Sequence, residues 1–278
     1  MKQKIITGIV SGIAFIGILF AINTVVFPFV IALLSAIAVF EIGNAVHLKN
    51  RPIQVLSIAV AAFVPLLVGF DWQIPLMPAV TAYVILVFLF MLLQYEKTRF
   101  EHAVFALFAS LIVPYAFSTI LLLRDVDKTF SGVYTKTDGI FFVILGLFCA
   151  WLTDIFAYFA GSFLGKHKLA PKISPKKTIE GAIGGIVGTM LLNVALLAVF
   201  NKFFFEHTVI SYWAIILTSV LLAIISICGD LTASTLKRNY NIKDFGSLLP
   251  GHGGIMDRFD SYLFVMPVLY SVIVFVNR

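Results

Sequence analysis

The chain has 278 residues, of which 60% are hydrophobic and only 12% are charged, and its mean hydropathy is +1.03. Soluble domains are about 45–50% apolar and about 25% charged, so a water-soluble globular protein is excluded and lipid must be the solvent for much of the surface. The net charge is +6, and its distribution along the chain follows the membrane, as described below, so it does not indicate nucleic-acid binding.

Nine apolar stretches are long enough to cross about 30 Å of hydrocarbon as helices. In chain order they are 5–22, 24–43, 53–70, 74–94, 102–123, 139–163, 178–200, 209–230 and 259–276. The first two fit either a tight helical hairpin or two partly inserted segments, and no convincing signal-peptide cleavage site follows the first. The runs are too long for the strands of a membrane barrel and lack their alternation. We therefore predict an all-α, polytopic integral membrane protein with about nine transmembrane helices.

Positive side chains are unevenly distributed among the loops. With the N-terminus in the cytoplasm and the loops assigned alternately to the two sides, fifteen of the 20 Lys and Arg residues fall inside and the other five outside. Cytoplasmic loops carry an excess of Lys and Arg. The distribution therefore predicts an N-in, C-out orientation in the cytoplasmic membrane.

Residues that could carry chemistry are concentrated in the second half of the chain. Up to residue 138 the connections between spans are short, whereas two long polar segments, 164–178 and 231–258, follow on the predicted cytoplasmic side. We therefore divide the chain into residues 1–138, with about five membrane helices, and residues 139–278, a catalytic region with about four spans. The cysteines, Cys149 and Cys228, lie within apolar stretches, which favours small buried side chains over a disulfide or metal pair.

Asp154 lies about two turns inside the sixth predicted span. On a helix it shares one face with Ala157, Tyr158, Gly161 and Gly165. A carboxylate at this depth requires a partner or a cavity. The alternative is a packing residue that is hydrogen-bonded to a neighbouring helix.

The loop after this span is rich in lysine. Ser174 and Pro175 are typical N-cap and N1 residues, so we predict that a helix begins there. It would present Lys176, Lys177 and free backbone N–H groups to a phosphate, with Glu180 following in the first turn. The alternative is an ordinary positive loop that contacts anionic lipid headgroups.

Polar residues also follow the eighth span. Ser226, Asp230, Ser234 and the Lys237–Arg238 pair recur at intervals of three or four residues, which predicts a polar stripe along a helix that leaves the membrane. The glycine-rich loop 250–254 could approach a ligand closely through its backbone.

Asp257 and Asp260 come directly after this loop, with the spacing of one helical face. Carboxylates beside lysines and a glycine-rich loop suit a Mg²⁺ ion that bridges phosphates. The alternatives are a loop without a ligand and a local charge pair between Asp257 and Arg258.

These residues resemble the signature of the phosphatidate cytidylyltransferases, also called CDP-diacylglycerol synthases. The longest match reads Ser234-x-Leu236-Lys237-Arg238-x4-Lys243-Asp244-x-Gly246-x2-Leu249-Pro250-x-His252-Gly253-Gly254-Ile255-x-Asp257-Arg258-Phe259-Asp260. Two upstream matches read Asp154-x2-Ala157-Tyr158-x2-Gly161-x3-Gly165-Lys166 and Ser174-Pro175-Lys176-Lys177-Thr178-x-Glu180-Gly181. The resemblance is specific over residues 154–261, and earlier it is limited to general hydropathy.

The resemblance implies an all-helical homodimer that converts CTP and phosphatidic acid to CDP-diacylglycerol and pyrophosphate in a Mg²⁺-dependent reaction. The predicted orientation places the site among membrane lipids and facing the cytoplasm. The resemblance also implies metal binding by Asp230 and Asp257, to which Asp260 or Asp154 could be added, and leaves open a second, monovalent cation such as K⁺. The expected catalytic residues are Asp230, Lys237, Asp257 and Asp260. The expected substrate-binding residues are Asp154, Tyr158, Lys176, Lys177, Thr178, Glu180, Ser234, Lys237, Arg238, Lys243, Asp244, His252, Gly253, Gly254 and Arg258.

Two other classes of protein are alternatives to this interpretation. Another CTP-using membrane lipid enzyme, such as a lipid kinase or a lipid-phosphate nucleotidyltransferase, would share these polar features. A transporter should show repeat symmetry and polar residues or broken helices near the midplane of several spans. Here the polar residues collect at the ends of spans, which favours an enzyme.

Overall fold

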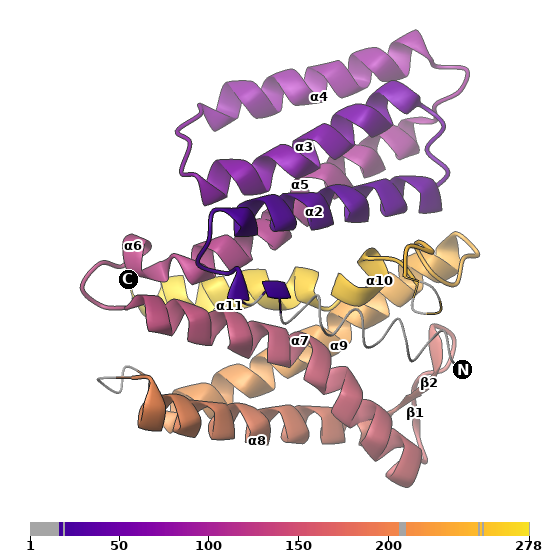
Figure 1. Ribbon diagram of the computed structural model, residues 1–278. Helices are drawn as coiled ribbons and strands as arrows, with labels where there is room; N and C mark the ends of the chain where they lie inside the picture. The colour runs from indigo at the N-terminus through magenta and orange to yellow at the C-terminus, as the bar shows by residue number, and fades with distance from the viewer. Residues whose placement is uncertain (1–16, 19, 206–209, 250, 252, 278) are drawn as a thin grey trace. The chain divides into compact units, whose positions relative to one another are not determined.

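Long helices make up most of the computed structural model, which describes residues 17–18, 20–205, 210–249, 251 and 253–277 (Figure 1). In this part of the chain, eight helical segments are long and apolar enough to cross a membrane. They are α2 (Val26–Ala45), α3 (Arg51–Gly69), α4 (Leu76–Leu93), α5 (Phe100–Arg124), α7 (Lys136–Leu164), α8 (Ile179–Phe203), α9 (Tyr212–Asn239) and the segment Met256–Val276, which contains α10 (Met256–Phe259) and α11 (Tyr262–Val276). A short helix, α6 (Val126–Thr129), precedes α7.

The predicted all-α membrane fold is confirmed, and eight of the nine predicted spans correspond to these segments. The remaining predicted span, 5–22, falls mostly outside the described residues. The total number of spans and the N-in, C-out orientation therefore stay predictions.

The chain forms two units that interleave in sequence. The described residues up to Leu121 fold with Tyr240–Arg258, and Leu122–Asn239 fold with the residues from Phe259 onward. The segment that carries most of the glycine-rich signature therefore belongs with the N-terminal helices. The predicted division at residue 138 concerns function and not packing, and it stays a prediction.

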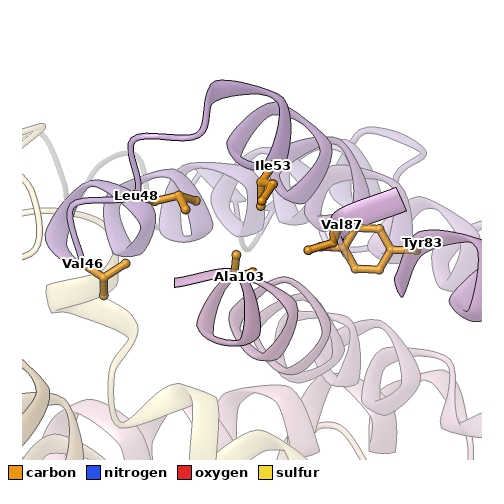
Figure 2. Close-up of a cluster of buried hydrophobic side chains, with 7 residues drawn as sticks. Val46, Leu48, Ile53, Tyr83, Val87 and Ala103 are labelled. Atoms are coloured by element: carbon orange, nitrogen blue, oxygen red, sulfur yellow. The ribbon is translucent and has the colours of Figure 1, made fainter. Parts of the chain in front are cut away.

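In the first unit, buried side chains from α3, α4, α5 and the loop after α2 pack together (Figure 2). The cluster consists of Val46, Leu48, Ile53, Tyr83, Val87, Ala103 and Ala106. Beside it, the buried Asn50 caps α3 by accepting the N–H of Ile53 at 3.2 Å, and its amide donates to the Phe90 carbonyl at 3.0 Å and the Thr98 hydroxyl at 2.8 Å. Since buried polar groups are stable only when they are hydrogen-bonded, Asn50 ties the α2–α3 loop to α4 and to the α4–α5 connection.

In the second unit, a row of glycines on α8 brings this helix close to α7. A Cβ atom at Gly184 would overlap the Ala160 side chain, and one at Gly188 would meet the Phe156 ring at 2.6 Å. Small residues allow helix backbones to approach closely in membranes. These glycines therefore set how closely α8 packs against α7.

A two-stranded antiparallel hairpin joins α7 to α8 (Figure 1). Its strands are β1 (Lys168–Ala170) and β2 (Ser174–Thr178), with Lys168 opposite Thr178. The prediction that Ser174 and Pro175 begin a helix is therefore wrong. The N-cap of α8 is Thr178, whose hydroxyl accepts the Gly181 N–H at 3.1 Å. Pro175 restricts Ser174 to extended backbone. Residues 174–178 therefore pair with β1 as a strand and do not begin a helix.

Candidate active site

A pocket of about 550 Å³ lies in the second unit among α7, the hairpin, α8 and α9. Its charged and polar lining comes from α7, the two strands of the hairpin and α9. These residues are Asp154, Tyr158, Ser162, Lys168, Ser174, Lys176, Lys177, Thr178 and Asp230. The structure thus brings together six of the residues predicted to bind substrate or metal, from both upstream motifs and from the polar stripe of α9.

Lys177 is the electrostatic centre of this pocket. Its ammonium group lies 3.2 Å from Asp154 Oδ1 and forms a second ion pair with Asp230 Oδ2. Burial by itself lowers the pKa of Lys177, but the charges of Asp154 and Asp230 outweigh it, so that the pKa is raised above its ordinary value. Lys177 is therefore positively charged at neutral pH. Asp154 has both a partner and a cavity, either of which would meet the requirement of its depth.

Two glycines at the end of α7 let the hairpin lie against this helix. A Cβ atom at Gly161 would meet the Thr178 hydroxyl oxygen at 2.8 Å, and one at Gly165 would meet the same oxygen at 2.9 Å. The absence of side chains here leaves room for β2. Because β2 then passes the pocket-facing side of α7, Lys177 reaches Asp154.

Glu180 organises the other end of the hairpin. Its carboxylate accepts the backbone N–H groups of Lys166 at 3.0 Å and of His167 at 3.2 Å, and lies 2.6 Å from His167 Nδ1. It fixes the turn that leads from α7 into β1 and is not part of the pocket lining. Its predicted contact with substrate stays a prediction.

The polar stripe is helical, as predicted, because α9 continues to Asn239, well beyond the predicted span end at residue 230. Ser234 is half-buried on this extension. Arg238 Nε donates to the Ile173 carbonyl at 3.3 Å, so the end of α9 also holds the turn of the hairpin. Lys237 lies close enough to Asp260 for their charges to interact.

Asp260 is 7% exposed and lies in the turn between α10 and α11. Its Oδ1 accepts the Ser261 N–H at 2.7 Å, and the charges of Asp154 and Asp230 act on it. The prediction that Asp257 and Asp260 share one continuous helical face is wrong, since α10 ends at Phe259. A local bond from a side chain to the backbone competes with helix continuation at such a position.

The signature loop, residues 243–257, lies in the first unit. Lys243 and Asp244 are exposed at its start. Asp257, which is 8% exposed, accepts the Phe245 N–H at 2.8 Å and the Gly254 N–H at 3.0 Å through Oδ2. These two bonds close the loop on itself and orient the Asp257 carboxylate.

Three further residues that were predicted to bind substrate belong to this loop or directly follow it in sequence. Gly253 has a φ of 83°, and a Cβ there would approach Asp257 Oδ2 to 2.8 Å, so glycine is required on both counts. Arg258 is exposed on α10. His252 lies outside the described residues.

Glu41 is a residue that the sequence analysis missed. It lies in α2, is 4% exposed, and accepts the N–H groups of Ile255 at 3.1 Å and Met256 at 2.8 Å. A single acidic residue inside an apolar span is the signal that could have found it.

The carboxylates at the pocket are of the chemical type that binds a magnesium ion. Within the described ranges, no group of three or more His, Cys, Asp and Glu side chains lies close enough to hold a metal by itself. Magnesium takes one or two protein carboxylates and completes its shell with water and phosphate oxygens. Asp154 and Asp230 already share one cation, the Lys177 ammonium, so their oxygens converge on a position that favours positive charge.

Comparison with known proteins covers the whole chain. A model of the cytidylyltransferase family matches residues 2–276. The phosphatidate cytidylyltransferase of Staphylococcus haemolyticus is 32% identical over 277 residues, which are 99% of each chain. The one from Bacillus subtilis is 32% identical over 285 residues, covering 98% of this chain and 97% of the relative. The similarity therefore extends well beyond residues 154–261.

Proposed function

Because this chain belongs to the cytidylyltransferase family, we propose that the pocket around Lys177 is where it transfers a cytidylyl group to a membrane lipid. The protein is a nucleotidyltransferase that converts CTP and phosphatidic acid to CDP-diacylglycerol and pyrophosphate, a step of phospholipid biosynthesis. The observation that carries the site assignment is the meeting of Lys177 with Asp154 and Asp230 at one pocket.

Both substrates are anions, which oppose each other's approach. A phosphate monoester carries about −1.5 to −2 charge near pH 7, and CTP adds a triphosphate. Lys168 and Lys176 are exposed at the pocket, and Lys177 is charged within it. These lysines neutralise the phosphates, and Lys237, Arg238, Lys243 and Arg258 are the further cations that the signature supplies.

The bond changes need little acid–base chemistry. An oxygen of the lipid phosphate attacks the α-phosphorus of CTP and forms a new P–O bond. The bond from the α-phosphorus to the oxygen that bridges to the β-phosphate breaks, and its electron pair leaves with pyrophosphate. The attacking phosphate is already largely ionised, so the chain has no need of a dedicated base. Positioning and electrostatic stabilisation account for the acceleration.

The proposal includes Mg²⁺ held by Asp230 and Asp257, with Asp154 or Asp260 as an additional ligand and with room for a monovalent cation such as K⁺. When bound, Mg²⁺ would neutralise charge that develops on the phosphates. The support for Asp257 is its orientation by two backbone N–H groups. The support for Asp230 is its half-buried place in the charged cluster of Lys177.

The surroundings of the pocket suit a lipid that enters from the side. Tyr158, 71% exposed, lines the pocket, and Phe159, Phe163 and Ile183 are exposed apolar side chains on α7 and α8. Acyl chains would lie against this surface while the phosphate reaches the lysines. The excess of Lys and Arg in the predicted inner loops favours a cytoplasmic site, and the resemblance favours a homodimer.

The test is incorporation of labelled CTP into lipid by the purified protein in detergent, with phosphatidic acid and Mg²⁺ supplied. We expect CDP-diacylglycerol from the wild type, and no product after addition of EDTA or in the folded Asp257→Ala protein. Lys177→Ala should lose activity, whereas Lys172→Ala, in the turn of the same hairpin but outside the pocket lining, should keep it.

Failure to convert phosphatidic acid in folded wild-type protein would overturn the substrate assignment. Equal activity of Lys177→Ala and Lys172→Ala would overturn the assignment of the pocket. Normal turnover of Asp257→Ala would overturn the proposed metal ligand.

A further inference from the structure

Glu41 is a buried acid far in sequence from the signature loop, yet it contacts this loop directly. It is the charged residue of helix α2 and is 4% exposed. Ionisable groups inside membrane spans are costly and are retained where they have partners. The partners of Glu41 are the backbone N–H groups of Ile255 and Met256, at 3.1 Å and 2.8 Å.

Two glycines of the signature form a socket for the Glu41 side chain. A Cβ atom at Gly246 or at Gly254 would overlap the Glu41 carboxyl group. Any larger residue at either position would push the carboxylate away from the N–H groups that it accepts. Both glycines are therefore explained by the close approach of Glu41 to the loop backbone.

Three consecutive backbone N–H groups of one turn donate hydrogen bonds to Asp257 and Glu41. The Gly254 N–H donates to Asp257 Oδ2 at 3.0 Å, and the next two N–H groups donate to Glu41. Asp257 also accepts the Phe245 N–H at 2.8 Å, one residue before Gly246. Glu41 thus holds the backbone directly after Gly254 through two hydrogen bonds and lies against Gly246, next to both residues that donate to Asp257.

We infer that Glu41 is a positioning residue for the cytidylyl transfer, through its hold on the Asp257 loop. Hydrogen bonds to an ionised acceptor are about twice as strong as neutral ones, so a carboxylate fixes this turn more firmly than an amide would. A glutamine offers one acceptor oxygen and turns its NH₂ group, a donor, toward a backbone donor. The inference rests on the proposed role of Asp257 as a ligand of Mg²⁺.

The experiment compares Glu41→Gln with Asn50→Ala in purified protein, measuring kcat, the KM for CTP, the Mg²⁺ concentration that gives half-maximal activity, and the melting temperature. Asn50 is a matched control, since it is a buried polar residue of the same unit. Its three hydrogen bonds do not involve the signature loop. Glu41→Asp, which keeps the charge on a shorter side chain, tests for partial rescue.

For Glu41→Gln we expect a fall in kcat of roughly 10–100-fold, the scale of a small misplacement of a catalytic group, together with a higher Mg²⁺ requirement. Glu41→Asp should recover part of the activity. Asn50→Ala should lower the melting temperature at least as much and keep its kcat and Mg²⁺ requirement.

Wild-type kcat and Mg²⁺ dependence in Glu41→Gln would overturn the inference, as would the same loss of kcat in Asn50→Ala at equal melting temperature. Asp257→Asn separates the two proposals. If Asp257→Asn is inactive while Glu41→Gln is normal, the positioning role alone fails. If Asp257→Asn is fully active, the proposed metal site fails.

Discussion

At the scale of single residues, Lys177 controls the charge balance of the pocket. Lys177→Met would leave Asp154 and Asp230 facing each other without the cation that they share. Breaking a buried ion pair costs about 3–5 kcal/mol, but Asp154 is 40% exposed, so screening reduces this to about 1–2 kcal/mol. We expect a lower melting temperature and at least a 100-fold loss of CTP incorporation, of the order that loss of one electrostatic stabiliser causes. Lys172→Met, the control, should change neither.

The raised pKa of Lys177 also predicts how pH affects this cluster. The ordinary pKa of lysine is 10.5, and the carboxylates of Asp154 and Asp230 raise it in the folded protein despite the opposing effect of burial. The contribution of the cluster to stability is therefore fully present below the unfolded value and is lost as pH rises through the higher folded value. The difference in melting temperature between wild type and Lys177→Met should stay constant from about pH 6 to pH 9 and shrink above about pH 10.5. A difference that shrinks between pH 6 and pH 9 would contradict this assignment.

Some residues of the site could be found from the sequence and others could not. Asp154 was found because a charge in an apolar run is visible without a structure, and Lys177 because it stands in a dense basic loop. That these two form an ion pair, with Asp230 as a third member, depends on three elements that meet in space. Glu41 gives the same signal as Asp154, but its partners are backbone N–H groups more than 200 positions away, and every residue type except proline supplies such a group.

At the scale of elements, capping preferences alone do not decide where α8 begins. Both Ser174 and Thr178 are capping residue types, and only the pairing of β2 with β1 decides between them. Thr178→Ala should lower stability by about 1 kcal/mol because it removes the N-cap bond to Gly181. Ser174→Ala should have little effect on stability, since Ser174 caps no helix. Thermal unfolding of the two variants provides the test, and a larger shift for Ser174→Ala would restore the helix start predicted from sequence.

The signature loop makes a second prediction at this scale. Gly254→Ala would place a Cβ atom against the carboxyl group of Glu41, so the loop and α2 would have to move apart. We expect CTP incorporation to fall as in Glu41→Gln. In the double variant with Glu41→Ala, which removes the overlapping group, the second substitution should cost much less than it does alone. Fully additive losses would mean that the two residues act independently.

At the scale of the whole molecule, hydropathy was sufficient for the spans but not for their grouping. Runs of apolar residues mark where helices cross lipid, which is why the eight segments agree with prediction within a few residues at most ends. That Tyr240–Arg258 folds with helices from the first 121 residues depends on contacts such as those of Glu41, which no periodicity encodes. The division of the chain at residue 138 could therefore not have been expected to follow the physical units.

Orientation in the membrane is the remaining whole-molecule prediction. The inner loops predicted from charge include the hairpin with Lys172, and the predicted outer loops include α6 with Lys128. In a background in which Cys149 and Cys228 are replaced by alanine, Lys128→Cys should react with a membrane-impermeant maleimide in intact spheroplasts. Lys172→Cys should react only after lysis, because the hairpin and its pocket would face the cytoplasm, where CTP is available. Labelling of Lys172→Cys in intact spheroplasts would invert the topology, and a pocket on the outer face could not be supplied with CTP from inside the cell.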